Sequence, residues 1–205
     1  AAAHRGEITA EVTSAHALDE AQENKFRLVF EKMNLKPGDK HLDVGCGWGS
    51  MVRYAARQGV KSLGVTLSKE QAEWAQAKIK EEGLEELAEV RFLDYRDVTE
   101  TDFDGISSIG LLEHIGVDNY ASYFQFLADK LRPGGVMVNH CITYPDNHKT
   151  PQGDFINRYI FPDGELTGSG TIIYEMQDHG FEVFHEENIR FDYMRTLRDW
   201  CENLK

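Results

Sequence analysis

Residues 42–49 read Leu42-Asp43-Val44-Gly45-Cys46-Gly47-Trp48-Gly49 and join a short apolar run to the start of a helical pattern. The three glycines permit a sharp turn and let a ligand approach the backbone closely. Their spacing is GxGxG and lacks the helix-side fingerprint GxGxxG that suits a dinucleotide. The spacing therefore favours a ligand without phosphates. The alternative is that the glycines only make a tight turn between a strand and a helix.

Short apolar runs alternate with helical patterns on both sides of this stretch. A packing helix over residues 18–33 comes first and ends at a turn over residues 36–39. The expected strands are 41–44, 62–66, 89–93, 105–109 and 136–142, and the further expected helices are 50–58, 69–82, 117–131 and 194–204. This order predicts an α/β, Rossmann-like fold with a mostly parallel sheet wound on both faces.

The size of the chain suits one domain, because its 205 residues, 41% of them hydrophobic, can bury a full core. We expect residues 1–205 to form that single domain, with residues 1–16 as a tag remnant or a disordered terminus. Residues 144–168 include an irregular stretch with three prolines after the fifth strand. Long irregular segments in compact domains tend to be functional, so we expect a lid insertion on the substrate side.

The net charge of −13 would repel nucleic-acid phosphates, so nucleic acid is not an expected partner. No stretch approaches the roughly 18 uninterrupted apolar residues that cross a bilayer. The three cysteines, Cys46, Cys141 and Cys201, lie far apart, which argues against a disulfide framework and against a metal site. We expect a soluble, cytoplasmic protein without a metal.

Polar side chains follow the next two strands, where parallel strands end at a common edge. The stretch Gly64-Val65-Thr66-Leu67-Ser68, followed by Gln71, offers hydroxyl and amide groups for ribose. The stretch Asp94-Tyr95-Arg96-Asp97 offers a carboxylate and a ring for adenine. With Asp43, Gly45 and Gly47, three strand ends are predicted to converge on an adenosine-like ligand. For Ser68 we prefer a simpler role as the cap of the next helix, and Asp97 has the alternative of a surface ion pair.

Six motifs occur in the order LDVGCGWGS, GVTLSKEQ, LDYRD, SIGLLEHIG, FINRYIFPDGEL and FDYMRTLRDW, over about residues 18–204. In this respect the chain resembles the cyclopropane-fatty-acid synthases and the mycolic-acid cyclopropane synthases, members of the S-adenosylmethionine-dependent methyltransferases. The glycine loop marks only that broad class, whereas EHIG and YIFPDGEL are more specific. The resemblance implies the class I methyltransferase fold. It also implies transfer of a one-carbon unit from S-adenosylmethionine to the cis double bond of an unsaturated, phospholipid-linked fatty acyl chain, giving a cyclopropane or a methylene- or methyl-branched product.

The resemblance also implies roles for individual residues. Catalytic positions fall on Glu113, His140 and Tyr193, and the same three with Ile142 fall on the positions that hold a bicarbonate ion, the base of the family. The cofactor positions fall on Thr66, Gln71, Asp94, Tyr95 and Ile109. Each catalytic position has a structural alternative: a core histidine for His140, packing on its own helix for Tyr193 and a helix cap for Glu113. Phe155, Tyr159 and Phe161 suit either lid packing or the walls of an acyl pocket.

The implied partners are an unsaturated fatty acyl phospholipid, a transient contact with the inner face of the membrane, a reductase if the product is methyl-branched, and a second copy in a homodimer. Because the net charge is negative, a membrane contact needs apolar groups or a partner. Two other functions stay open. An amine N-methyltransferase shares the dipeptide Glu113-His114 after the fourth strand. A non-catalytic cofactor-binding homologue is favoured by residues 7–16, which lack the family's tyrosine-serine-cysteine motif.

Overall fold

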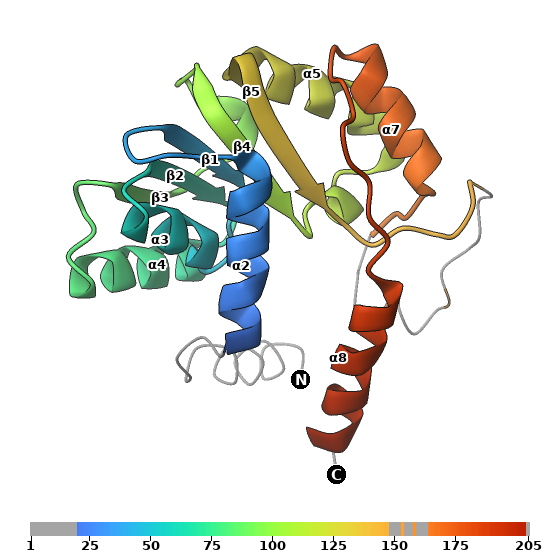
Figure 1. The fold of residues 1–205 in the computed structure, drawn as a ribbon, viewed down its shortest axis with the longest axis horizontal. Coiled ribbons are helices and arrows are strands. Elements are labelled where there is room, and N and C mark those ends of the chain that lie inside the picture. The colour runs from blue at the N-terminus through green and yellow to red at the C-terminus, as the bar shows by residue number, and fades with distance from the viewer. Residues whose placement is uncertain (1–19, 148–152, 154–157, 159–163, 204–205) are drawn as a thin grey trace.

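The computed structural model describes residues 20–147, 153, 158 and 164–203 (Figure 1). Its sheet has five parallel strands in the order β3-β2-β1-β4-β5. Their bounds are β1 Lys40–Val44, β2 Lys61–Thr66, β3 Ala88–Phe92, β4 Phe103–Ile109 and β5 Leu131–His140. The chain runs outward from β1 to β3 and then crosses back to β4, so β1 and β4 flank the point where the strand order reverses. Open α/β sheets bind ligands at such a point, at the carboxyl ends of the strands.

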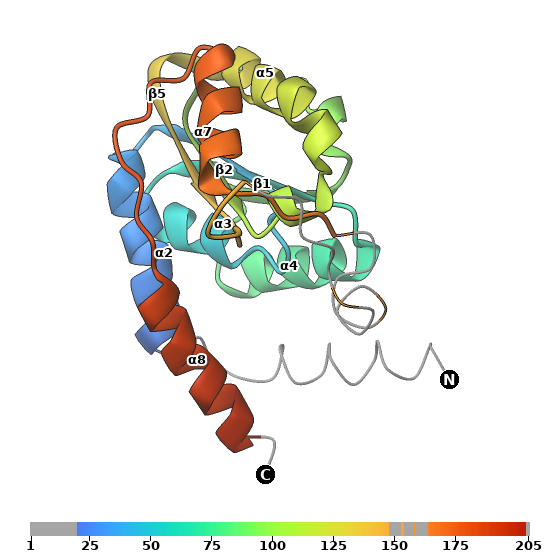
Figure 2. The ribbon, with the colours of Figure 1, turned by 90° about the vertical axis from the view of Figure 1, so that its right-hand side faces the viewer.

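Helices cover both faces of the sheet, as Figure 2 shows from the side. The helices α2 (Glu20–Met33), α3 (Ser50–Arg57) and α4 (Lys69–Glu81) lie on one face, and α5 (Tyr120–Lys130) and α7 (Ser169–Asp178) lie on the other. Side chains along β1 alternate between the two faces of the sheet. Leu42 and Val44 pack toward α5, and the alternate residues point to the opposite face. The predicted Rossmann-like, doubly wound parallel sheet is confirmed.

Close packing of α3 on the sheet explains why residue 64 in β2 is a glycine. A Cβ atom added to Gly64 in β2 would lie 2.6 Å from Val52 Cγ2 on α3 and 2.8 Å from Cys46 Sγ in the glycine loop. Only a residue without a side chain lets the helix approach this strand. This packing fixes the glycine loop against the centre of the sheet.

The main differences from the prediction concern two predicted elements and one helix that was not predicted. The predicted strand 136–142 is β5, which begins at Leu131 and ends at His140, because its pairing with β4 continues past a register shift between Phe103 and Gly105. The predicted helix 117–131 is a 3₁₀ turn, Val117–Asn119, followed by α5. The helix α7 has no counterpart in the prediction, because its first turn, Ser-Gly-Thr-Ile-Ile, is poor in helix-forming residues. Contact of Ile172 with the core under α5 outweighs that weak propensity.

The last described helix, α8 (Arg190–Asn203), extends away from the sheet and its covering helices (Figure 1). Three of its apolar side chains are exposed, namely Phe191, Met194 and Leu197. Within the described ranges, no helix has the length and apolar character that crossing a membrane requires. The predicted terminus 1–16 lies outside the described residues.

Candidate active site

The three glycines of the loop after β1 differ in what surrounds them. All three have positive φ angles, +73° at Gly45, +53° at Gly47 and +68° at Gly49. An added Cβ would lie 3.0 Å from a Leu111 side-chain carbon at Gly45 and 2.9 Å from the Ala75 Cβ at Gly49, so packing accounts for these two. At Gly47 an added Cβ would meet nothing within 4 Å. The loop therefore opens to free space at Gly47, at the edge where a ligand is expected.

Asp43, at the end of β1, is 3% exposed, and its Oδ1 accepts a hydrogen bond of 2.5 Å from the hydroxyl of Ser107 on β4. Burial raises the pKa of Asp43 to about 7, against the opposing effects of the Ser107 hydrogen bond and the positive charge of Lys25. Such a carboxylate, partly ionised near neutral pH beside an open glycine, suits a ligand that carries positive charge.

The residues after β2 form a local hydrogen-bonded turn. Thr66 Oγ1 donates to Gln71 Oε1 over 2.8 Å and accepts the backbone N–H of Ser68 over 3.2 Å. Ser68 caps α4 by accepting the backbone N–H of Gln71, which confirms the role we preferred for it. The turn brings Thr66 and Gln71 together at the carboxyl edge of the sheet, where both are predicted to contact the cofactor.

Asp94 and Tyr95 follow β3, where Asp94 bonds to Arg96 and the ring of Tyr95 packs on the core. Both oxygens of Asp94 accept hydrogen bonds from the Arg96 guanidinium, at 2.9 Å and 2.6 Å, and these bonds hold the pKa of Asp94 below its usual value. The ring of Tyr95 packs edge-on against Tyr123 and Phe126, with centroids 5.4 Å and 5.2 Å apart. Binding of adenine by Asp94 and Tyr95 stays a prediction. In this structure the exposed Arg96 is hydrogen-bonded to the Asp94 carboxylate.

Glu113, in the 3₁₀ turn Leu112–His114 after β4, is 5% exposed. Its Oε1 accepts the backbone N–H of Ile142 over 2.8 Å, whereas its Oε2 is buried and has no hydrogen-bond partner within the described part of the chain. His140 is the last residue of β5. Its Nδ1 is buried with no partner among the residues that the structure describes, and burial lowers its pKa. Ile109 is paired with His140 in the sheet register. The structure thus brings Glu113, Ile142, His140 and Ile109 to one edge. Glu113 Oε2 and His140 Nδ1 stay unsatisfied there as far as the described residues show.

The C-terminal end of the expected lid segment, residues 144–168, contributes a residue that sequence reasoning did not select. Glu165 donates its backbone N–H to the carbonyl of Glu113 over 2.9 Å, and its Oε2 accepts the N–H of Val117 over 2.8 Å. Tyr144 donates its N–H to Thr167 over 3.0 Å, so the two ends of residues 144–168 meet. The motif YIFPDGEL contained Glu165, but only the folded chain shows that it clamps the turn that carries Glu113.

Lys25 on α2 is a second residue that sequence reasoning missed. α2 packs across β4 and β5 (Figure 1), with Met33 near Gly105 at the start of β4 and Val29 in the cluster that includes Ile109 at its end. Lys25 lies one turn before Val29, so it falls near the carboxyl ends of these strands. Lys25 is exposed by its accessible surface, but partial desolvation lowers its pKa, and the charges of Asp43 and Glu113 oppose this effect. Helical spacing indicated this face, but a lysine on a helix is ordinarily assigned to solvent.

Several predicted residues lie outside the described side chains. The backbone of Tyr193 belongs to α8, but its side chain is not described, so its approach to Glu113 and His140 stays a prediction. Phe155, Tyr159 and Phe161 also lie outside the described residues, as does most of the expected lid between residues 148 and 163.

Comparison with known proteins identifies the family of the chain. The family model of mycolic acid cyclopropane synthetase matches residues 10–205. The chain belongs to this family of S-adenosylmethionine-dependent methyltransferases. A probable fatty acid methyltransferase of Mycobacterium tuberculosis is 64% identical over 189 residues, which cover 92% of this chain and 44% of that protein. The cyclopropane-fatty-acyl-phospholipid synthase of Escherichia coli K12 is 38% identical over 193 residues, covering 93% of this chain and 48% of that protein.

A solved structure of the mycolic acid cyclopropane synthase CmaA1, complexed with SAH and CTAB, is similar with a TM-score of 0.80 and 32% identity, over 90% of this chain and 69% of that one. The resemblance drawn from the motifs is thereby confirmed, and so is the class I methyltransferase fold. The chain spans about half the length of the curated relatives it matches.

Proposed function

We propose that this chain is the methyltransferase part of an enzyme that transfers a one-carbon unit from S-adenosylmethionine to the cis double bond of an unsaturated fatty acyl chain on a phospholipid. The observation that carries the proposal is the pair of buried atoms Glu113 Oε2 and His140 Nδ1, which have no hydrogen-bond partner among the described residues, in a chain of this family. A buried carboxylate oxygen without a partner is costly, so such an atom suggests a bound ligand. The product is a cyclopropane or a methylene-branched fatty acid, depending on where a proton leaves, and a reductase partner would then reduce the methylene branch to a methyl branch.

The cofactor in this proposal lies over the glycine loop. The residues that would hold it are Asp43, Gly45, Gly47, Thr66, Gln71, Asp94, Tyr95 and Ile109. The open space at Gly47 and the buried carboxyl of Asp43 fit a ligand with positive charge and no phosphate. A similar protein, CmaA1, was solved in complex with SAH, which supports S-adenosylmethionine as the class of cofactor. When bound, S-adenosylmethionine supplies an electrophilic methyl group on a sulfonium.

The proposal includes a bicarbonate ion held by Glu113, His140, Ile142 and Tyr193. The described members of this set fit such an ion, because bicarbonate carries one O–H that Glu113 Oε2 can accept, and His140 offers a buried ring nitrogen. The N–H of Ile142 bonds to Glu113 Oε1 and so orients the carboxylate. When bound, the ion supplies a base.

The protein's own contribution is placement, exclusion of water and electrostatics. An alkene is a weak nucleophile, so its reaction needs a dry, well-oriented site and stabilisation of developing positive charge. The buried carboxylate of Glu113 supplies negative charge at this edge. Residues 144–168 are proposed as the lid over the substrate, tied at its base by Glu165. We extend the proposal to a transient contact with the inner membrane face, a homodimer and, for a branched product, a reductase partner.

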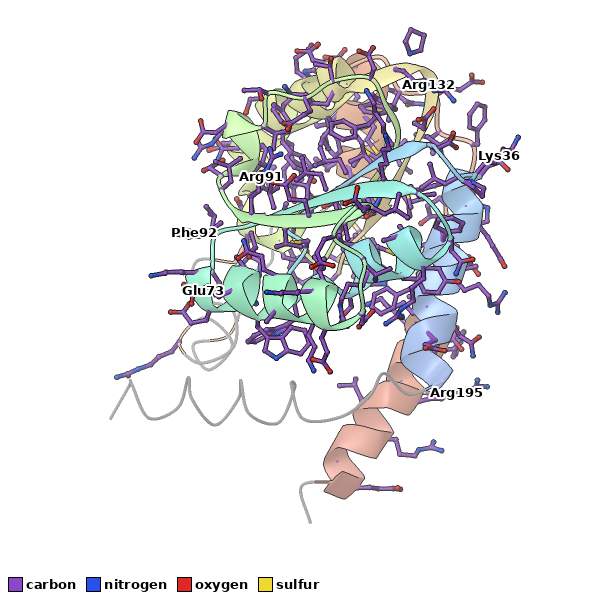
Figure 3. The ribbon with its side chains drawn as sticks, turned by 90° about the vertical axis from the view of Figure 1, so that its left-hand side faces the viewer. Lys36, Glu73, Arg91, Phe92, Arg132 and Arg195 are labelled. Atoms are coloured by element: carbon purple, nitrogen blue, oxygen red, sulfur yellow. The ribbon has the colours of Figure 1, made fainter. Side chains whose placement is uncertain are left out.

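The test is mass spectrometry of phospholipid acyl chains from cells that express the full-length protein and receive methyl-labelled methionine. Three forms are compared: the wild type, Glu113→Gln, and the matched control Glu73→Gln on the solvent face of α4 (Figure 3). We expect monounsaturated chains to gain one labelled carbon in the wild type and the control but not in Glu113→Gln. Fragmentation then separates a ring from a branch. A labelled amine without labelled lipid would favour the amine methyltransferase, and cofactor binding without any labelled product would favour a non-catalytic homologue.

A further inference from the structure

A chain of hydrogen bonds crosses the three central strands beneath the glycine loop. His41 on β1 joins Ser62 on β2 through Nδ1, at 2.8 Å, and Ser107 on β4 through Nε2, at 2.9 Å. Ser107 continues the chain by donating to Asp43 Oδ1 over 2.5 Å. The exposed fractions are 0% for His41, 4% for Ser62, 0% for Ser107 and 3% for Asp43, so water does not compete for these bonds. These four side chains make a buried relay that ends on a residue of the proposed cofactor site.

The hydrogen bonds of this relay all donate in the same direction. An ionised Asp43 only accepts, so the Ser107 hydroxyl donates to it and its oxygen receives the N–H of His41 Nε2. Burial lowers the pKa of His41 to about 3, so the imidazole is neutral at physiological pH and carries one N–H. With that proton on Nε2, Nδ1 accepts from the hydroxyl of Ser62. Every donor therefore points toward Asp43.

We propose that Ser62, His41 and Ser107 are positioning residues that hold Asp43 ionised and oriented for a positively charged cofactor. The inference rests on the proposed function, because it assumes that Asp43 faces S-adenosylmethionine. A buried carboxylate needs such compensation, since burial alone favours the neutral acid. A neutral Asp43 would offer the cofactor no negative charge.

The charged and titratable groups around Asp43 set the pH range in which the relay acts. Burial raises the pKa of Asp43 to about 7, and the Ser107 hydrogen bond and the charge of Lys25 on α2 counteract it. Burial, and then the charge of Asp43, raise the pKa of Cys46 in the glycine loop. The Tyr123 hydroxyl on α5, whose pKa is also raised mainly by burial, is affected by Asp43 as well. Cys46 and Tyr123 are thus neutral, and ionisation of Asp43 governs the charge that a cofactor meets between about pH 6 and 8.

The experiment measures the Kd of S-adenosylmethionine for the full-length protein by calorimetry from pH 6 to pH 9. Ser107→Ala removes the donor to Asp43, and Ser62→Ala is the matched control, because it removes an equally buried hydroxyl from the far end of the relay. We expect the wild type to bind more tightly as pH rises through about 7. In Ser107→Ala the midpoint should rise by about one pKa unit or more, so that affinity falls roughly fivefold at pH 7 and returns to the wild-type value near pH 9. The control should shift the midpoint less.

A purely structural role for the relay predicts a different outcome, namely an equal loss of affinity at every pH, and this result would overturn the inference while leaving the proposed function standing. If the wild type does not bind S-adenosylmethionine at any pH, the proposed function fails. The relay is then decided by nuclear magnetic resonance, through the carboxyl titration of Asp43 with and without Ser107→Ala and the tautomer of His41. A proton on Nδ1 of His41 would refute the relay. If Ser107→Ala does not fold, His41→Gln, which keeps a donor toward Ser107, is compared with His41→Leu, which does not.

Discussion

Alanine at Gly47 tests whether the glycine loop holds a ligand or only makes a turn. Gly83, just after α4, provides the matched position. The φ angles are +53° at Gly47 and +67° at Gly83, and at both positions an added Cβ would meet nothing within 4 Å. The two substitutions therefore cause the same backbone strain without a clash. They differ in one respect, since only Gly47 lies beside the proposed cofactor.

The expected magnitudes follow from this comparison. Alanine in the left-handed region costs about 1–2 kcal/mol, so each variant should lower the free energy of unfolding by that amount and Tm by roughly 2–8 °C for a chain of this size. The methyl group added at Gly47 projects into the open space where the cofactor would lie. We expect it to raise the Kd for S-adenosylmethionine at least about tenfold, or ~1.4 kcal/mol, whereas Gly83→Ala should leave the Kd unchanged.

Thermal unfolding by circular dichroism and calorimetric titration with S-adenosylmethionine measure the two effects separately. If Gly47→Ala is destabilised as much as Gly83→Ala yet binds the cofactor like the wild type, the loop serves only as a turn and the assignment of Gly47 is refuted. Equal losses of affinity in both variants would contradict it as well, because binding would then depend on general stability.

Two further predictions concern neighbours of this loop. Lys25→Met removes a positive charge that lowers the pKa of Asp43, so that pKa should rise above about 7 and the pH midpoint of cofactor binding should move upward. Lys25→Arg keeps the charge and should keep the midpoint. Titration of the Kd against pH tests this, and an unchanged midpoint in Lys25→Met would contradict the placement of Lys25. Gly64→Ala would bring a methyl group to 2.6 Å from Val52 Cγ2 and 2.8 Å from Cys46 Sγ. Urea unfolding should show a loss of about 1–3 kcal/mol in the free energy of unfolding, with partial recovery in the double variant Gly64→Ala/Val52→Ala. If the double variant shows no recovery, Val52 is not the source of the strain.

Local patterns predicted most of the fold because each strand and its following turn lie together in the sequence. The glycine loop, β1 and the helix after it follow from a few adjacent residues. The start of β5 and the helix α7 did not follow, because β5 is extended by pairing with β4 and α7 forms where Ile172 meets the core under α5. Both depend on contacts between residues that are distant in the chain, which a local pattern does not contain.

The same distinction applies to the site. Motifs predicted Glu113, His140 and Ile142, and the structure brings Glu113 to the backbone of Ile142. His41, Ser107 and Lys25 were not selected, because their relevance arises only when neighbouring strands and α2 place them around Asp43. A histidine in an apolar strand gives no sign of its partners until the register of the strands is known.

The two buried carboxylates at this edge are held by different parts of the molecule. Asp43 is bonded through the sheet itself, by a relay that spans β1, β2 and β4. Glu113 is held by loops instead, because Ile142 after β5 donates to its side chain and Glu165 donates to its carbonyl. Sheets move less than loops, so the proposed cofactor half of the site is the more preorganised one, while the proposed substrate half rests on the loops that carry Ile142 and Glu165. Changes in these loops should therefore alter the choice of acyl chain with little effect on cofactor affinity.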